Sequence, residues 1–411
     1  MCAALVLWIL SAVVCVGGGH HHLGYAKENQ ETAVDSWDNR NSLVTSASTE
    51  FAYRLYRKLA GLTESQGKNV FFSPFSVSVA LAALSVGARG ETHRQLFSGL
   101  GFNSSQLAQT DVDQAFRILL ASMQSHKDIS AGTAVFVDSF FKPQPEFLDV
   151  LKQSYYAEGF NLNFTKTTES SNTINKYVSG KTNGKIDKLV ESLDPDTVMY
   201  LISYIYYKGK WATPFDPRLT GPEDFNIDEK NKVVVQMMKI EEGNFETYHD
   251  QILNTTVLHL PFNNSYSMLL LLPNNMETLE KAISPAHVTK WLTWKKPSEY
   301  TIYVPKFSIK TSHELNGVLT EMGIADMFGN RANFSGISEK QNLVVSAVVH
   351  KASLDVDEVG ATAAAATGIG FIPLSYHFVP ELKFNRPFMV IVTERNTKHT
   401  LFMGKIVNPN I

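Results

Sequence analysis

The sequence predicts one large α+β domain that follows an N-terminal leader. Two observations predict this class: helical and strand patterns are mixed along the chain, and no Pro/Ser-rich linker or charge run divides it after about residue 45. The 411 residues are 44% hydrophobic and 11% aromatic, which is enough apolar material for a single large core. A formal net charge of −3 gives no electrostatic reason to expect nucleic acid as a partner.

The leader is expected to consist of a secretory signal peptide, residues 1–19, and a flexible tail, residues 20–45. An apolar run over residues 3–16, followed by small residues, is typical of such a peptide, although no basic region precedes it. The run is too short to span a membrane comfortably. We therefore expect a secreted, extracellular protein with no membrane partner.

Cysteine usage and glycosylation sequons agree with secretion. Both cysteines, Cys2 and Cys15, lie in the leader, so the mature chain is expected to depend on core burial and not on disulfides. Asn-x-Ser/Thr sequons, which accept glycans on surface loops, occur at Asn103, Asn163, Asn254, Asn263 and Asn333. No metal site is predicted, because the histidines at 20–22 have no cysteine or carboxylate at ligand spacing.

The first elements of the domain carry clear local signals. Apolar residues recur at every fourth position from 51 to 59 and stop at Gly61, which predicts an amphipathic helix. Residues 69–90 are typical of a short strand that leads into a helix, with Ser73 as the N-cap and Pro74 in the first turn. Because this second helix is apolar on nearly every side, it must be buried.

The next segments predict structure and exclude two ligands. A helix is expected over residues 106–123, and its single basic residue, Arg117, gives no reason to expect heparin as a partner. A strand is expected over 133–141 and a helix within 171–190. Residues 180–185 resemble a phosphate-binding loop, but the spacing is one residue short and the final Ser/Thr is missing, so nucleotide binding is not predicted.

The centre of the sheet is predicted at residues 197–211, a long strand that is apolar on both faces and should therefore be covered on both. Residues 343–356 have the length and apolar density of another buried strand. Further strands are expected at 232–240, 255–262, 268–272, 300–309, 381–392 and 400–407, and further helices at 276–282 and 314–322.

Residues 357–375, between two predicted strands, form the most unusual stretch. Residues 360–370 are almost all Gly, Ala and Thr, too small for a core and too poor in β-branched residues for an ordinary strand. If the stretch joined a sheet, every second residue from 361 to 371 would face the core, and the small leading residues could enter between strands with little disturbance. A flexible Ala/Gly linker is the alternative that composition leaves open.

Catalytic signatures are missing from the sequence. It contains no Gly-x-Ser-x-Gly elbow, no His-Glu-x-x-His pair, no cysteine outside the leader and no dinucleotide-binding glycine pattern. An enzyme is therefore the weaker hypothesis, although the twelve histidines and forty acidic residues could form an active site without a signature. No cofactor is expected.

Several separated motifs together make the chain resemble the serpin family, in particular the antitrypsin-like (clade A) plasma serpins. The resemblance covers about residues 46–411, and the combination and order of the motifs are highly specific. The motifs are Asn69-Val-Phe-Phe-Ser-Pro-Phe-Ser76, Lys208-Gly-Lys-Trp211, residues 357–367, Phe384-Asn-Arg-Pro-Phe388 and Phe402-Met-Gly-Lys-Ile-Val-Asn-Pro409.

The resemblance implies a single domain, 46–411, with three β-sheets, eight or nine helices and an exposed reactive-centre loop at about 358–379. Counting the family's loop length places the scissile bond at Leu374–Ser375, preceded by the subsite residues Phe371, Ile372 and Pro373. The implied hinge comprises Glu358, Gly360, Ala361, Thr362, Ala363, Ala364, Ala365, Ala366 and Thr367. The implied sheet-opening region comprises Ser73, Ser76, Ser203, Trp211 and His350, with Ser203 where many members have asparagine.

The function that the resemblance implies is suicide inhibition of a serine protease. The protease would attack Leu374, form a covalent acyl-enzyme and be trapped when the cut loop inserts into a sheet. A leucine at this position favours chymotrypsin-, cathepsin G- or elastase-like targets over trypsin-like ones. A monomer is expected. The alternative is a non-inhibitory serpin that carries a small hydrophobic ligand such as a hormone.

Overall fold

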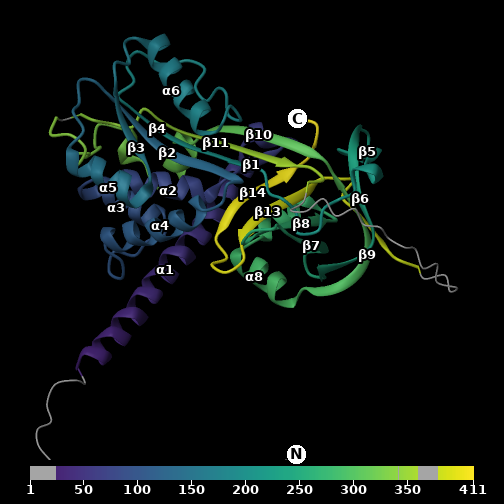
Figure 1. The fold of residues 1–411 in the computed structure, drawn as a ribbon. Helices are drawn as coiled ribbons and strands as arrows, with labels where there is room; N and C mark the ends of the chain where they lie inside the picture. The colour runs from purple at the N-terminus through teal and green to yellow at the C-terminus, as the bar shows by residue number, and fades with distance from the viewer. Residues whose placement is uncertain (1–24, 341, 360–377) are drawn as a thin grey trace, which may run out of the picture.

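The computed structural model describes residues 25–340, 342–359 and 378–411 (Figure 1). The expected signal peptide, residues 1–19, lies outside these ranges.

The first helix begins earlier than the sequence patterns predict. Helix α1 runs over Tyr25–Gly61, so it covers most of the segment that was expected to be a flexible tail, and Val44 within that segment is buried. The residues before 45 include Ala, Glu, Lys and Gln, which favour helix without an apolar stripe, and this explains why periodicity alone missed them. In Figure 1 the N-terminal part of α1 projects away from the rest of the molecule.

The remaining helices of the described residues are mostly short and amphipathic. Helix α2 is the exception, because all of its residues are buried, as its sequence predicts. The helices after α1 are α2 (Pro74–Ser85), α3 (Gly90–Gly99), α4 (Gln109–Gln124), α5 (Pro145–Tyr155), α6 (Thr167–Lys181), α7 (Met276–Ala282), α8 (Pro285–Trp294) and α9 (Asn316–Glu321).

The smaller of the two sheets in the described chain has five strands in the order β10-β11-β4-β2-β3. Their bounds are β10 (Phe307–Glu314), β11 (Ala347–Val356), β4 (Met199–Tyr207), β2 (Ile129–Asp138) and β3 (Glu158–Leu162). The pairs β11–β4 and β2–β3 are parallel, and the other two are antiparallel. Strand β4 lies at the centre, where its two apolar faces predict it.

Both faces of this sheet are covered, and alternate residues serve different cores. Val135 of β2 and Leu201 of β4 belong to the main core, whereas Phe136 and Ile202, their neighbours in sequence, pack in a second cluster with α6. Figure 1 shows α6 and α2 on opposite sides of the sheet. The sheet is therefore a middle layer.

The larger sheet has nine strands, with the order β1-β14-β13-β8-β7-β6-β9-β12 and β5 paired to β6. Their bounds are β1 (Val70–Phe72), β5 (Gly221–Asn226), β6 (Lys232–Asp250), β7 (Thr255–Pro261), β8 (Tyr266–Pro273), β9 (Lys296–Pro305), β12 (Glu381–Lys383), β13 (Phe388–Glu394) and β14 (Thr400–Ile406).

The long strand β6 explains why three expected sheets form two hydrogen-bonded networks here. Its register against β9 shifts between Ile240 and Gly243. Before the shift β6 also pairs with β5, and after it β6 pairs with β7. One strand thus belongs to two differently oriented parts of the sheet.

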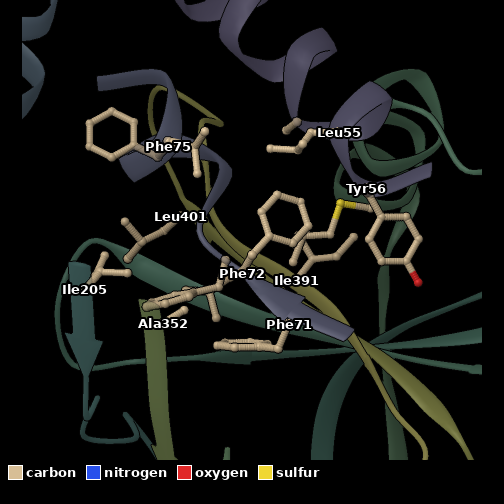
Figure 2. Packing of buried hydrophobic residues seen from close by; sticks show 14 of the residues in the cluster. Leu55, Tyr56, Phe71, Phe72, Phe75, Ile205, Ala352, Ile391 and Leu401 are labelled. Atoms are coloured by element: carbon tan, nitrogen blue, oxygen red, sulfur yellow. The ribbon is translucent and has the colours of Figure 1, made fainter. Parts of the chain in front are cut away.

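The main core joins the two sheets. Figure 2 shows Phe71 and Phe72 of β1 among side chains from α1, α2 and strands of both sheets. The rings of Phe71 and Phe402 stack with centroids 5.1 Å apart. This apolar contact fixes the position of β1 and of the N-terminus of α2 beneath the five-stranded sheet.

Candidate functional site

The site is organised around the contact between β4 and β11. These two strands are parallel neighbours, with Ser203 opposite His350 in the register. The chain leaves β11 at Val356, at the same end of the sheet where β4 ends at Tyr207. A strand that folded back from the end of β11 would therefore run antiparallel to both neighbours.

A buried hydrogen-bond chain links these two strands to the N-terminus of α2. The Ser203 hydroxyl lies 3.0 Å from His350 Nδ1 and 2.7 Å from the Ser76 hydroxyl. The backbone N–H of Ser73 donates to His350 Nε2 at 2.9 Å. The Ser73 hydroxyl, the predicted N-cap, accepts from the Ser76 N–H at 3.1 Å.

The hydrogen-bond partners of His350 show which ring nitrogen carries its proton. Burial, followed by the neighbouring His313, lowers the pKa of His350 to about 3, so the ring is neutral at physiological pH. Because Nε2 accepts a backbone N–H, the single ring proton is on Nδ1 and is donated to Ser203. The Ser203 hydroxyl is then free to donate to Ser76. Every group in this hydrogen-bond chain is therefore uncharged.

The segment that follows β11 is held by backbone contacts around Trp211. The indole Nε1 of Trp211 donates to the carbonyl of Asp357 at 2.7 Å, and its backbone N–H donates to the carbonyl of Val359 at 3.0 Å. The N–H of Phe215 donates to the carbonyl of Glu358 at 3.2 Å. Three consecutive residues are thus tied to the loop that follows β4.

Two ion pairs reinforce this attachment. Lys208 Nζ lies 2.7 Å from Asp357 Oδ2, and Lys306 Nζ lies 2.9 Å from Glu358 Oε2. Burial favours the neutral form of Glu358, but the Lys306 hydrogen bond and other contacts outweigh it and lower the pKa of this carboxyl. Glu358 therefore stays ionised and bound to Lys306 at neutral pH.

The far end of the loop is anchored in the other sheet. Strand β12 pairs in parallel with β9 through Glu381–Thr301, Leu382–Ile302 and Lys383–Tyr303. The chain that leaves the five-stranded sheet at residue 356 thus reaches the nine-stranded sheet at residue 381. The segment between these two attachments is therefore held at both ends.

The structure brings together four of the five residues of the predicted sheet-opening region, namely Ser73, Ser76, Ser203 and His350. Trp211 lies elsewhere, at the end of the sheet, where it binds the segment that includes Glu358. The other predicted hinge residues, 360–367, the subsites 371–373 and the bond 374–375 lie outside the described residues.

The ion pairs of the attachment have no signal in the sequence. Lys208 and Asp357 lie inside two of the family motifs and Lys306 lies outside them, but no motif indicates an ion pair for any of the three. Each pair joins residues that are distant in sequence, so no local pattern could indicate it.

All five sequon asparagines are exposed at the surface of the molecule. Groups of three or more His, Cys, Asp or Glu side chains placed to hold a metal ion are absent from the described ranges. In the same part of the chain no helix has the length and apolarity needed to cross a membrane.

A cavity of about 510 Å³ lies away from the loop, between α1, α4, α8 and the turn that joins β13 to β14. Apolar side chains such as Leu119, Val288 and Leu292 form part of its wall. Polar groups, including Asn41 and Tyr53, form the rest. Its size and mixed lining suit a small organic ligand.

The sequence is similar to those of known proteins. A family model described as "Serpin (serine protease inhibitor)" matches residues 46–409. An alpha-1-antitrypsin-like protein of Tamias sibiricus is 38% identical over 411 residues, 98% of this chain and 97% of its own. Serine protease inhibitor A3N of Rattus norvegicus is 38% identical over 415 residues, 98% of each chain.

Solved structures are also similar. That of human thyroxine-binding globulin has a TM-score of 0.83 at 34% identity and covers 90% of this chain and 100% of its own. That of human glycosylated kallistatin has a TM-score of 0.82 at 35% identity and covers 90% of this chain and 99% of its own.

Proposed function

Since the chain belongs to the serpin family, we propose that it inhibits a serine protease by acting as a suicide substrate whose cut loop inserts between β4 and β11. The parallel contact between these strands carries the proposal, because it offers an antiparallel register to a strand that folds back from β11. The protein acts as substrate and trap, with no catalytic turnover of its own.

Cleavage is the step that frees the strand. In the intact chain the loop is held at Val359 through Trp211 and at residue 381 through β12. Once the proposed Leu374–Ser375 bond is attacked, the segment before the cut has a free end that carries the acylated protease. About fourteen inserted residues at about 3.3 Å each span about 46 Å, which carries the protease to the opposite end of the sheet.

Register arithmetic predicts which residues would face the core. If residues 357–360 form the turn, residue 361 lies opposite Val356. In an antiparallel pair, each residue further along the loop then lies opposite the residue one position earlier in β11. Ala363 is then opposite Leu354, and Thr367 is opposite His350. Since Leu354 and His350 are buried and face the core, their partners would face it too.

Insertion separates Ser203 from His350, and the loop is suited to repair this break. The Ser203–His350 hydrogen bond crosses the gap that the new strand would enter. The hydroxyl of Thr367, placed at the same level, can accept from His350 Nδ1 and donate to Ser203. The Nδ1 atom of His350 and the hydroxyl of Ser203 then both keep a hydrogen-bond partner.

The proposed targets are chymotrypsin-, cathepsin G- or elastase-like proteases, because the Leu374 side chain fills a large apolar specificity pocket and offers no charge to a trypsin-like one. A direct test mixes the purified protein with chymotrypsin and looks for a complex that survives SDS on a gel, with heat-inactivated protease as the control. Complete cleavage of the protein with no such complex would contradict inhibition.

A second candidate function, transport of a small hydrophobic ligand, is favoured by the cavity between α1, α4 and α8. A similar solved structure is described as thyroxine-binding globulin in complex with thyroxine. Titration with thyroxine, followed by quenching of tryptophan fluorescence, tests this alternative. Val288→Trp, which fills the cavity wall, should abolish the binding if it occurs there. A carrier would bind thyroxine and form no SDS-stable complex.

A further inference from the structure

A smaller cavity, of about 240 Å³, lies where the segment after β4 meets the register shift of β6 and the end of β7. Trp211, Phe245 and Leu260 form apolar parts of its wall. The polar side chains of Thr213, Glu246 and His259 complete it. The proposed inhibitory mechanism does not use this cavity.

The register shift of β6 creates the space. At the shift two residues of β6, Glu241 and Glu242, have a single opposite residue, Thr301 of β9, so the backbone bends away from the regular sheet. Gly243 follows, and a Cβ atom at this position would lie 2.7 Å from the ring of Phe245. The glycine lets the Phe245 ring lie against the backbone and form the cavity wall.

His259 is a buried polar residue that lines this cavity. Its relative exposure is 6%, and Nδ1 lies 2.8 Å from Glu246 Oε2. This contact with the carboxylate occupies Nδ1, which is itself inaccessible, so Nε2 is the ring nitrogen that remains for a ligand. The Nε2 atom of a buried histidine gains free energy when a ligand supplies a hydrogen bond to it.

The charges around the cavity favour a neutral ligand. The Glu246 carboxylate is bound by Lys295, which neutralises it. Burial and the nearby Lys295 and Arg395 charges lower the pKa of His259 to about 4, against the opposing effect of Glu246, so the ring is neutral at physiological pH. A neutral imidazole offers one donor and one acceptor, which suits an uncharged polar group.

We propose that this cavity binds a neutral aromatic molecule of one or two rings that carries an O–H or N–H donor. The ring would pack on the aromatic walls formed by Trp211 and Phe245, and the donor would bond to His259 or Glu246. The volume limits the ligand to this size, because larger organic ligands occupy cavities of about 300–1,000 Å³.

Trp211 connects the cavity to the hinge. Its side chain lines the cavity, while its indole Nε1 and backbone N–H hold the carbonyls of Asp357 and Val359. An occupant that fixes the Trp211 ring therefore stabilises these two bonds, which must break before a strand leaves the end of β11. The effect of the ligand on the hinge rests on the proposed function, whereas binding of the ligand to the cavity does not.

Binding is tested with 4-fluorophenol as the probe, by the saturable broadening and shift of its ¹⁹F NMR signal on addition of the full-length protein. We expect His259→Phe to weaken binding at least tenfold, because it removes the polar group and keeps an aromatic ring of similar size. His249→Phe, on the neighbouring strand segment but exposed, is the matched control and should bind as the wild type does. Equal binding by wild type and His259→Phe would overturn the site.

Two further measurements keep the test decisive if His259→Phe does not fold. Thr213→Trp places a large side chain at the exposed rim and should also weaken binding at least tenfold. The matched probe 4-fluoroanisole, which lacks the O–H donor, should bind about tenfold more weakly to the wild type, the loss of one hydrogen bond. Equal affinity for both probes would overturn the proposed ligand chemistry.

The link to the hinge has its own readout. A saturating concentration of 4-fluorophenol should slow formation of the SDS-stable chymotrypsin complex at least twofold in the wild type and leave it unchanged in His259→Phe. Binding without this effect would overturn the link and leave the site. Absence of the complex in every sample would contradict the proposed function alone, because the ¹⁹F signal does not depend on it.

Discussion

Burial decides the chemistry of single residues in this protein more than identity does. His350 and His249 are both histidines of a β-strand, but His350 is fully buried and bonded on both ring nitrogens, whereas His249 is exposed. Only the first can act as a neutral connector between two strands and a helix N-terminus. Because it lies at the contact between β4 and β11, the proposed insertion would have to break its hydrogen bond to Ser203.

At the proposed scissile bond, specificity depends on one side chain. We expect Leu374→Arg to shift inhibition from chymotrypsin-like to trypsin-like proteases by at least a hundredfold in relative rate, because an acid at the base of the trypsin pocket pairs with arginine. Association rate constants for chymotrypsin and trypsin measure the shift. An unchanged preference would place the bond elsewhere, with Tyr376–His377 the next candidate.

At the scale of elements, local signals located most of the strands and helices, and two of the errors arose where chain segments change sheet. The single strand predicted at 300–309 is two strands, because β9 belongs to the nine-stranded sheet and β10 to the five-stranded sheet, with Lys306 between them. The strand predicted at 381–392 is likewise interrupted at 384–387, where Pro387 cannot donate to a ladder. A hydrophobic pattern records burial and not which sheet supplies the partner.

For the site as well, local features could be predicted from the sequence and long-range contacts could not. The Ser73 cap could be predicted because its signal lies within four residues of sequence, and the family resemblance supplied Ser203 and His350. The ion pair between Lys306 and Glu358 forms because the junction of β9 and β10 lies beside the end of β11 in the folded protein. No spacing in the sequence indicates this contact.

The register proposed for the inserted strand makes Ala363 a core-facing position. We expect Ala363→Arg to convert the inhibitor into a substrate, because an unpaired guanidinium facing Leu354 costs several kcal/mol and slows insertion while deacylation continues. Thr362→Arg is the matched control, since it would face the partly exposed Asp355 and keep a charge partner. Moles of inhibitor consumed per mole of protease silenced measure the effect, and a ratio near one for Ala363→Arg would contradict the register.

The same register makes a subtler prediction for Thr367. Thr367→Val keeps the shape but removes the hydroxyl that would bridge Ser203 and His350 after insertion. We expect the cleaved protein to lose about 1–3 kcal/mol of stability, the cost of unsatisfied buried polar groups, and the intact protein to lose nothing. Denaturant midpoints of both forms measure this. A similar loss in the outward-facing control Thr362→Val would show that the register is wrong.

At the scale of the whole molecule, insertion should leave the protein more stable than before. Cutting the loop near Leu374 adds a central strand to the five-stranded sheet and buries residues such as Ile369 and Phe371. The intact form is then held by a kinetic barrier and not by its free energy. Melting scans of intact and nicked protein should show a clearly higher midpoint for the nicked form. Equal midpoints would favour a carrier that does not insert its loop.

The buried histidines also make the intact fold sensitive to acid. Burial is the main cause that lowers the pKa of His350 to about 3 and those of His259 and His399 to about 4. Below an ordinary pKa of about 6.5 the unfolded chain binds these protons and the folded chain does not, so stability falls as the pH falls from 6.5 toward 4. Each histidine contributes a loss that approaches about 1 kcal/mol per pH unit in the middle of that window and is smaller at its ends.

Denaturant midpoints at pH 7 and pH 5 test this sensitivity. His399→Gln should show a smaller drop between the two pH values than the wild type, and His249→Gln, which changes an exposed ring, should show the same drop. A wild-type midpoint that does not change across this range would mean that the rings are protonated in the folded protein.

The loop is held at Val359 by Trp211 and at residue 381 by β12. These two attachments also limit how many protease molecules one molecule of this protein can silence. If a cut is the only way to free the strand, and the inserted strand cannot return, each molecule acts once. The quantity of protease that can be silenced then equals the number of intact molecules present, as with a titrant. Any protease that cuts the loop without being trapped lowers that number, and new synthesis alone restores it.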